Sequence, residues 1–396
     1  MINILFVDDE PNILEGLQRM LRPLRREWQM SFVGSGAEAL ALLGENCIDV
    51  IVSDMRMPGM DGAQLLTTVQ QEHPQVVRFI LSGYAEKAMA LKSAGVAHQY
   101  LAKPCDPELL KAAVSRTCGL GDSLNDSKLR LLVAQMQTVP SLPTLYTEVM
   151  NELQKADPSL RKIGEIIKQD IGMTVKMLQL VNSAFFGLRR QISDTTDAVN
   201  FLGLDTITSL VLALGIFSQF EGQETSGAVI AGLWSHSSAV GAMAKAIAAK
   251  ESREAMHNAF TAGLLHDIGE VVLAVNMPQQ FAAVEELITS QNISPTEAER
   301  QLFEATHAEI GAYLLGMWGL PEPVVEAVAL HNTPGASATT SFTALTAVHV
   351  ANVMHRAASS HYAPEQRVYD TSYLEKIGLL GRISVWQESC AQFIAL

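Results

Sequence analysis

Polar side chains follow four short apolar runs in the first part of the chain, each at the point where a strand is expected to end. The runs lead into Asp8-Asp9, Asp54, Ser82 and Lys103. In a parallel α/β sheet, ligand chemistry lies beyond the carboxyl ends of the strands. We therefore expect three carboxylates, one hydroxyl and one ammonium group to meet at one edge of a sheet.

This combination of groups is suited to binding a metal ion and a phosphoryl group. Three crowded carboxylates repel one another unless a cation neutralises them, and Mg²⁺ prefers oxygen ligands and joins readily to a phosphate. With the metal bound, Asp54 stays anionic and can attack a phosphoryl group, as carboxylate nucleophiles do. Lys103 would then neutralise one phosphoryl oxygen, and Ser82 would donate a hydrogen bond to another.

The phrases around these residues resemble the receiver domain of two-component response regulators. They are FVDDE, VSDMRMPGMDG, LSGYAE and YLAKP, in the family's order, and the resemblance covers about residues 2–119. It implies that Asp54 accepts a phosphoryl group from a sensor histidine kinase. It also implies that Mg²⁺ is bound by Asp8, Asp9 and Asp54, together with the backbone carbonyl of Arg56.

The same resemblance assigns a switch to the neighbouring strands. Ser82 and Lys103 match the family's switch hydroxyl and phosphate-contacting lysine. Tyr100 is the aromatic residue expected to change rotamer when Ser82 moves onto the phosphate. Phosphorylation is then expected to alter the surface built by the last two strand–helix units, and with it the contact with the helical domain or with another receiver.

A second group of candidate residues consists of histidines spread over several expected helices. Imidazoles beside a carboxylate suit Fe, Mn or Zn, and helices of a bundle can bring such residues together. The candidate ligands of a vestigial metal site are His236, His266, Asp267, His307 and His331. The alternative is that each histidine packs in a helical core with its hydrogen bonds satisfied. We expect that role for His257 and His349, which have no motif support.

The histidine-containing region resembles the HD metal-dependent phosphohydrolase superfamily, whose core order is His, His-Asp, Asp. It resembles more closely the HDOD output domain, a relative that lacks a complete catalytic set. The phrases that carry this resemblance lie within residues 139–332 and include LQLVNSAFFG, LWSHSSAVGAMAKAIA, GLLHDIG and ATHAEIGAYLLGMWGLPEPVVEAVALHN. It implies an output that acts by binding another signalling protein.

Several positions depart from the catalytic relatives. Asn352 stands where active members close the metal site with an aspartate, and a neutral amide is a poor substitute for an anionic ligand. His331 is followed by Asn332-Thr333 where the cyclic-di-GMP phosphodiesterases have His-Glu, and their Gly-Tyr-Pro signature is absent. Glu270 replaces the lysine after the His-Asp pair. We therefore predict a non-catalytic output domain. The alternative that stays open is a metal-dependent phosphohydrolase, such as a cyclic-dinucleotide phosphodiesterase.

The secondary structure that must position these residues is predicted to change near residue 120, from alternating strands and helices to helices alone. Before residue 120, five apolar runs alternate with amphipathic patterns, at residues 3–7, 30–33, 50–53, 77–81 and 99–102. This alternation predicts a (βα)5 flavodoxin-like, doubly wound parallel sheet. The later patterns are helical and predict an all-α, HD-like domain. Two of its expected helices cover residues 259–275 and 295–318.

The resulting division of the chain has four parts. We expect a receiver at residues 1–119, a linker with a connecting helix at 120–138, an HDOD domain at 139–335 and a C-terminal helical extension at 336–396. A length of 396 residues fits two or three domains.

Composition limits the cellular compartment in which the protein is expected and the kinds of partner it is expected to bind. The formal charge of −14 offers no large basic face, so nucleic acid is not an expected ligand. We find no apolar run long enough for a membrane span and no secretory signal. The widely spaced Cys47, Cys105, Cys118 and Cys390 indicate reduced thiols. We expect a cytoplasmic protein whose partners are a sensor histidine kinase, a downstream signalling protein and, as a further candidate, a second copy of the chain.

Overall fold

The computed structural model describes most of the chain. The described residues are 1–82, 97–103, 105, 107–108, 110–111, 113–114, 148–149, 151–153, 155, 157–182, 191–204, 207, 224–358 and 367–394. The linker and connecting helix expected at residues 120–138 lie outside these ranges.

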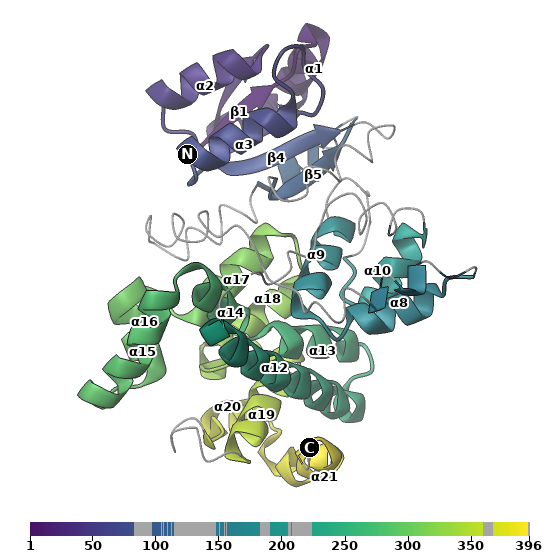
Figure 1. Cartoon of the computed structure of the whole chain (residues 1–396), viewed down its shortest axis with the longest axis vertical. Coiled ribbons are helices and arrows are strands. Elements are labelled where there is room, and N and C mark those ends of the chain that lie inside the picture. Colours follow the sequence, from purple (N-terminus) through teal and green to yellow (C-terminus); the bar gives the residue numbers. More distant parts are fainter. Residues whose placement is uncertain are drawn as a thin grey trace.

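The N-terminal part forms a five-stranded parallel sheet with strand order β2-β1-β3-β4-β5 (Figure 1). The strands are β1 (Ile2–Val7), β2 (Trp28–Val33), β3 (Val50–Asp54), β4 (Val77–Ser82) and β5 (Gln99–Ala102). The direction in which strands are added reverses between β1 and β3, so these two strands flank the switch point where ligand sites form. The parallel sheet predicted from the apolar runs is confirmed.

Helices cover both faces of this sheet. They are α1 (Pro11–Met20), a 3₁₀ turn η1 (Arg22–Arg26), α2 (Gly36–Glu45) and α3 (Gly62–Glu72). Alternate residues of β1 enter opposite cores: Leu5 packs with α2 and α3, whereas Phe6 packs with α1. The apolar runs of β1 and β3 are explained by this two-sided burial, because both faces of these central strands are covered.

All described elements after β5 are helical, which confirms the predicted helical region. The longer helices are α8 (Leu160–Ile167), α9 (Ile171–Val181), α10 (Thr195–Leu202), α12 (Glu224–Glu251), α13 (Ala255–Leu265), α14 (Ile268–Asn276), α15 (Pro278–Gln291), α16 (Pro295–Phe303), α17 (His307–Met317), α18 (Glu322–Leu330), α19 (Ala344–Ala357) and α21 (Ile383–Ile394). The shorter ones are η4 (Pro334–Ala336), α20 (Thr371–Lys376) and η6 (Leu380–Arg382). Helix α12 packs against α13, α19 and α21.

Two expected helices are each broken into two. The helix expected at 259–275 is interrupted at His266-Asp267, between α13 and α14. The helix expected at 295–318 ends at Phe303, because Glu304 takes a left-handed conformation with φ 60° and Thr306 then caps α17. The apolar periodicity continues across both breaks, so the pattern alone could not show them.

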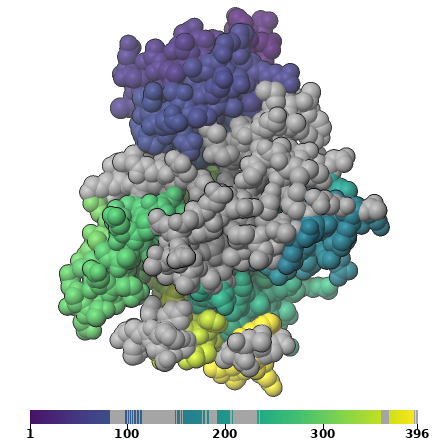
Figure 2. Space-filling model, viewed as in Figure 1, coloured from purple at the N-terminus to yellow at the C-terminus, as the bar shows by residue number. Residues whose placement is uncertain are grey.

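The sheet and the helical region meet at β5. This strand lies beside α9 and near the C-terminal end of α17 (Figure 1). The side chain of Gln99 is only 3% exposed and donates a hydrogen bond to the backbone carbonyl of Met317, at 2.8 Å. The N-terminal residues form one end of the molecule, and the last helices form the opposite end (Figure 2).

Two expectations from composition can be compared with the described residues. Cys47, Cys105 and Cys390 form no disulfide bond among the described residues, while Cys118 lies outside the described ranges. Among the described helices, none is by itself long and apolar enough to cross a bilayer. One pair, Ala255–Asn276 with Pro278–Gln291, reaches that length and composition together but bends by 115°.

Candidate functional sites: a carboxylate cluster and a histidine cluster

The carboxylates expected at the edge of the sheet are brought together. Asp8 and Asp9 follow β1, and Asp54 ends the adjacent strand β3. One oxygen from each of the three side chains lies within 4.8 Å of the other two. The backbone N–H of Glu10 donates to Asp8 Oδ1 at 2.9 Å, and that of Arg56 donates to Asp54 Oδ2 at 3.0 Å. These bonds orient two buried carboxylates toward a common point.

Lys103 supplies the cation of this cluster. Its Nζ lies 2.7 Å from Asp8 Oδ2 and also contacts Asp54 Oδ1. Burial lowers the pKa of Lys103, but its hydrogen bonds and charge interactions with the two aspartates outweigh burial and raise it. Burial raises the pKa of Asp54, against the opposing effect of Lys103. Three carboxylates facing one ammonium group leave negative charge uncompensated, and this oxygen-rich set fits Mg²⁺.

The two predicted switch residues are placed by their strands alone. Ser82 is the last residue of β4 and pairs with Ala102, and Tyr100 lies in β5 opposite Ile80. Their side chains are outside the described part of the structure. Arg56 contacts Asp54 through its N–H, whereas the metal-binding role of its carbonyl stays a prediction.

The five candidate metal ligands of the helical region also converge, because four of them lie at or beside helix ends. His266 follows the last residue of α13 and Asp267 precedes the first residue of α14. His307 opens α17, and His331 follows the last residue of α18. His236 comes from within α12. The side chains of all five are at least 95% buried.

Asp267 stands between two pairs of histidines, one pair on each carboxylate oxygen. Around Oδ2, His236 Nε2 lies at 3.4 Å and His266 Nε2 at 3.1 Å, and these two nitrogens are 3.2 Å apart. Around Oδ1, His307 Nε2 lies at 3.5 Å and His331 Nε2 at 3.4 Å, and these nitrogens are also 3.4 Å apart. We call these groups the Oδ2 triad and the Oδ1 triad. Both have the size of a three-ligand metal site.

The other ring nitrogen of each histidine fixes its orientation. His266 Nδ1 and His331 Nδ1 each lie 2.8 Å from a carbonyl three residues earlier, Gly263 and Val328. Donation from Nδ1 leaves Nε2 unprotonated in the neutral ring, with its lone pair directed at Asp267. This partnership with the last helical turn is the same at the ends of α13 and α18.

His307 is held by a carboxylate. Its Nδ1 lies 2.7 Å from Glu299 Oε1, and its backbone N–H donates to Glu299 Oε2 at 2.9 Å. Burial lowers the pKa of His307, but the charges of Glu299 and Glu270 outweigh burial and raise it to about 10. Burial raises the pKa of Glu270 to about 8. In contrast, burial lowers the pKa of His266 to about 4.

Three residues of this cluster were not among the sequence candidates. Glu299 was assigned to the same helix as His307, and only the break before α17 lets it fold back onto that histidine. His355 Nδ1 lies 2.9 Å from His236 Nδ1, and Arg356 NH2 lies 3.7 Å from Asp267 Oδ2. His355 and Arg356 follow Asn352 by three and four residues on α19, so they share its helix face. This spacing from Asn352 was the sequence signal that could have placed His355 and Arg356 beside the cluster.

Asn332 is one of the positions at which the sequence departs from the catalytic relatives. Its side chain links His331 of the Oδ1 triad to Arg356 beside the Oδ2 triad. Its Nδ2 lies 2.8 Å from His331 Nε2, and its Oδ1 accepts a hydrogen bond from Arg356 NH1 at 3.3 Å. Asn352 is 2% exposed, and its Oδ1 has no hydrogen-bond partner among the described residues.

The spacing of the cluster depends on a glycine. Gly269 follows Asp267 by two residues and packs directly on the backbone of His307, where a Cβ atom would overlap the carbonyl oxygen. Only glycine therefore allows α14 to approach the first turn of α17 this closely.

The two histidines expected to be structural lie outside the cluster of ligands. His349 uses both ring nitrogens, with Nδ1 2.9 Å from the His331 carbonyl and Nε2 accepting from Asp370 N at 3.0 Å. His257 is half exposed and lies 3.3 Å from Asp194 Oδ2, so the expectation that it packs in a helical core is wrong.

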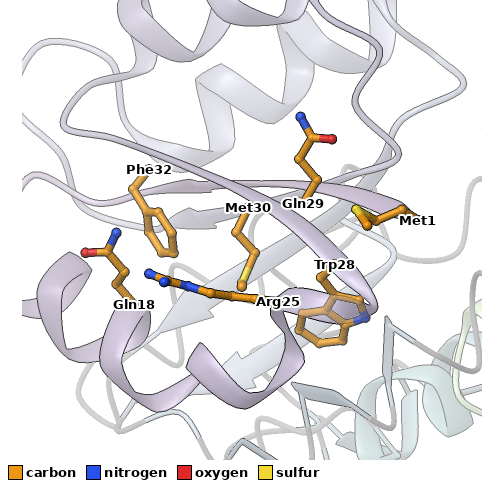
Figure 3. Close-up of a pocket in the computed structure, with 7 residues that line it drawn as sticks. All are labelled: Met1, Gln18, Arg25, Trp28, Gln29, Met30 and Phe32. Atoms are coloured by element: carbon orange, nitrogen blue, oxygen red, sulfur yellow. The ribbon is translucent and has the colours of Figure 1, made fainter.

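A pocket of about 320 Å³ opens beside the edge strand β2 (Figure 3). It is lined by Met1, Gln18, Arg25, Trp28, Gln29, Met30 and Phe32, and the side chain of Arg25 extends between Phe32 and Trp28. The lining contains no carboxylate, imidazole or thiol, and β2 lies at the opposite edge of the sheet from β5. The pocket therefore offers no carboxylate nucleophile for phosphotransfer and no carboxylate, imidazole or thiolate to hold a metal ion.

Comparison with known families agrees with this two-part architecture. Residues 4–115 match the response regulator receiver domain family, and residues 139–334 match the HDOD domain family. The chain therefore combines an N-terminal receiver domain with a C-terminal HDOD domain.

Individual relatives match parts of the chain. An uncharacterized protein of Treponema pallidum is 30% identical over 208 residues, which are 52% of this chain and 40% of that protein. The hydrogenase transcriptional regulatory protein HoxA of Cupriavidus necator is 36% identical over 110 residues, 27% of this chain and 22% of HoxA. The chain thus spans less than half the length of these curated relatives. The solved MmoQ response regulator of Methylococcus capsulatus is 21% identical with a TM-score of 0.48, covering 62% of this chain and 97% of MmoQ.

Proposed function

We propose that this protein is a cytoplasmic response regulator in which a sensor histidine kinase phosphorylates Asp54. Mg²⁺ would be held by Asp8, Asp9 and Asp54, with the Arg56 carbonyl as a further ligand. The observation that carries this proposal is the meeting of these three carboxylates with Lys103 at the carboxyl edge of β1, β3 and β5.

The contacts of Asp54 support a nucleophilic role. Its Oδ2 is oriented by the Arg56 N–H, and its Oδ1 faces the Lys103 ammonium. Mg²⁺ would keep the carboxylate ionised and offset the charge of an incoming phosphoryl group. Lys103 would then pair with a phosphoryl oxygen, and Ser82 and Tyr100 would respond as the switch.

Two short elements connect the phosphorylation site with the histidine cluster. Strand β5 runs from Gln99 to Ala102 and is followed directly by Lys103. Gln99 binds the carbonyl of Met317, the last residue of α17, and the first residue of that helix is His307. A displacement of Lys103 toward a phosphoryl group therefore has a direct route to the HDOD domain.

For the HDOD domain we propose an output by protein–protein interaction without turnover. Asn352 and Asn332 supply neutral amides at positions where catalytic relatives have ligands, and Arg356 contributes a fixed positive charge beside Asp267. The expected partner is a downstream signalling protein, with self-association as a further outcome.

Labelling with acetyl phosphate tests the receiver, and affinity capture tests the output. The full chain should take up one phosphoryl group in Mg²⁺ and lose it in Asp54→Asn. Capture of partners with and without beryllofluoride should differ between the two states, and analytical ultracentrifugation should report any change in self-association. Equal labelling of the variant would place the acceptor elsewhere.

A second candidate function is a metal-dependent phosphohydrolase, and the two triads around Asp267 favour it. His236, His266, Asp267, His307 and His331 would hold Fe, Mn or Zn. The ligand set fits such an ion, because Asp267 Oδ1 is buried without a hydrogen-bond partner among the described residues. A cyclic-dinucleotide hydrolysis assay on metal-loaded protein separates the candidates. Turnover that is lost in His266→Ala would favour the enzyme.

A further inference from the structure

We propose that the HDOD domain holds a single divalent transition-metal ion in the Oδ1 triad. In the Oδ2 triad, the positive charge of Arg356 replaces that of a second ion. This inference rests on the proposed metal-binding role of the histidine cluster and adds the number of ions and their position.

The Oδ1 triad has the geometry of a prepared site. Its three ligand atoms are 3.4, 3.4 and 3.5 Å apart. Tetrahedral coordination at ~2.1 Å would place ligand atoms ~3.4 Å from one another. Asp267 is 2% exposed, and its Oδ1 has no hydrogen-bond partner among the described residues. A buried carboxylate oxygen without a donor is costly unless a cation binds it.

The hydrogen bonds made by the Nδ1 atoms of the two histidines in this triad are also typical of metal ligands. His307 is backed by the Glu299 carboxylate and His331 by the Val328 carbonyl. Such partners fix the ring orientation and raise the basicity of Nε2. Two histidines and one carboxylate leave a coordination position for water. Asn332 Nδ2 lies 2.8 Å from His331 Nε2 and 3.3 Å from His307 Nε2, and it is the donor group that an ion would displace.

The Oδ2 triad differs because a cation that cannot release its proton to an incoming metal ion lies beside it. Arg356 is 5% exposed, and its NH2 lies 3.7 Å from Asp267 Oδ2. The guanidinium group keeps its proton under all ordinary conditions. A divalent ion bound ~2 Å from Oδ2 would therefore lie close to a permanent positive charge inside a buried site, where repulsion is weakly screened.

A one-ion site has a functional consequence. Two-metal phosphohydrolases use ions ~3.5–4 Å apart to clamp both the attacking and the leaving oxygen. With Arg356 in place of the second ion, that clamp is absent, which agrees with an output that binds a partner without turnover.

Metal content of the full-length protein tests this inference. The chain is stripped with EDTA, incubated with Zn²⁺ in a buffer that contains excess Mg²⁺ to occupy the receiver carboxylates, dialysed against the Mg²⁺ buffer, and analysed for zinc by inductively coupled plasma mass spectrometry. We expect one ion per chain, lost in His331→Asn and retained in His236→Asn. Removal of the charge in Arg356→Met should raise the content from one ion to two. His257→Asn, at the half-exposed histidine away from the cluster, is the matched control and should keep one ion.

Each outcome decides a separate point. Two ions in the unmodified chain, or one ion lost in His236→Asn but kept in His331→Asn, would overturn the assignment while leaving metal binding intact. No ion in any preparation would overturn both this inference and the metal-binding role. If Arg356→Met does not fold, the two histidine variants and the content of the unmodified chain still decide the number and the position.

Discussion

The side chain of Gln99 in the receiver domain donates a hydrogen bond to the backbone carbonyl of Met317 in the HDOD domain, at 2.8 Å. The last carbonyls of a helix have no partner within the helix. In α17 the carbonyls of residues 314–316 accept from backbone N–H groups that follow the helix, and the Met317 carbonyl accepts from Gln99. The receiver provides this last donor from the first residue of β5. The bond therefore makes the end of α17 depend on the position of the receiver.

Replacement of Gln99 by alanine is expected to loosen this contact. The Met317 carbonyl would lose its donor, at a cost of about 1–2 kcal/mol if it stays buried. Amide hydrogen exchange in the last turn of α17 should become faster in the unphosphorylated full-length protein. Gln71→Ala, at an exposed position of α3, serves as the control and should leave that exchange unchanged. Identical protection in Gln99→Ala would show that the hydrogen bond does not hold the domains together.

Asp54→Asn is expected to abolish labelling by acetyl phosphate and binding of beryllofluoride with Mg²⁺. The amide is a poor nucleophile and removes one of the three clustered anions. Asp197→Asn, an exposed position in α10, should label like the unmodified protein. Intact-mass spectrometry and ¹⁹F NMR report the two reactions.

Lys103→Ala is expected to separate metal binding from the response. The three carboxylates that would hold Mg²⁺ remain, and a competing cation that contacts Asp8 and Asp54 is removed. Mg²⁺ affinity, measured by calorimetry, should be equal or higher. The beryllofluoride-induced change in hydrogen exchange of β5 and α17 should be lost. Lys111→Ala, at a more exposed lysine, is the matched control. Loss of Mg²⁺ binding in Lys103→Ala would contradict the role given to the lysine.

Glu299→Gln is expected to weaken metal binding to the histidine cluster without removing a ligand. The glutamine keeps the size of the side chain but not the charge that holds His307 Nδ1. Loss of such a partner typically lowers metal affinity ~10–100-fold. Competition titrations with a Zn²⁺ chelator measure the change, and Glu285→Gln on the exposed side of α15 is the control. An unchanged affinity would remove Glu299 from the site.

The loss of folding stability at acidic pH is expected to depend on Asp194. This residue caps α10 through two backbone N–H groups and pairs with Lys168 at 3.0 Å. Burial raises the pKa of Asp194, but Lys168 and the cap bonds outweigh burial and lower it. Because the folded pKa lies below the unfolded value, the stabilisation is present above the unfolded pKa of ~3.9 and is lost as the pH falls through the folded pKa.

Asp194→Asn should therefore unfold with a flatter pH dependence below pH ~5 and lose about 1 kcal/mol at neutral pH. Urea titrations between pH 3 and 7 measure both effects. Asp197→Asn is the control for a nearby exposed carboxylate. An acid limb equal to that of the unmodified protein would assign the acid sensitivity to other groups.

The receiver half could be predicted from the sequence because its site residues follow directly after strands. Asp54 is placed by β3 and Lys103 by β5, so knowing the strands was enough to locate the side chains at one edge. Two-sided burial also gives the central strands β1 and β3 clear apolar runs, whereas the edge strand β2 (Trp28–Val33) mixes polar and apolar residues.

The histidine cluster could be predicted only in part, because its residues lie at helix breaks. The pattern of apolar residues continues through His266-Asp267 and past Glu304, and a continuous helix would have separated these side chains. Motif order located the ligands. The contacts of Arg356 and Glu299 depend on how α19 and α16 pack, which a local pattern does not specify.

The contact between Gly269 and the His307 carbonyl sets a limit on how this protein can diverge. Any side chain at 269 would push α14 away from α17, because its Cβ atom would overlap the His307 carbonyl oxygen. Since α17 also ends at the receiver, such a displacement would disturb the distant Gln99 contact as well. The absence of a side chain at 269 thus keeps α14 and α17 in contact, and through α17 it also preserves the contact between the HDOD domain and the receiver.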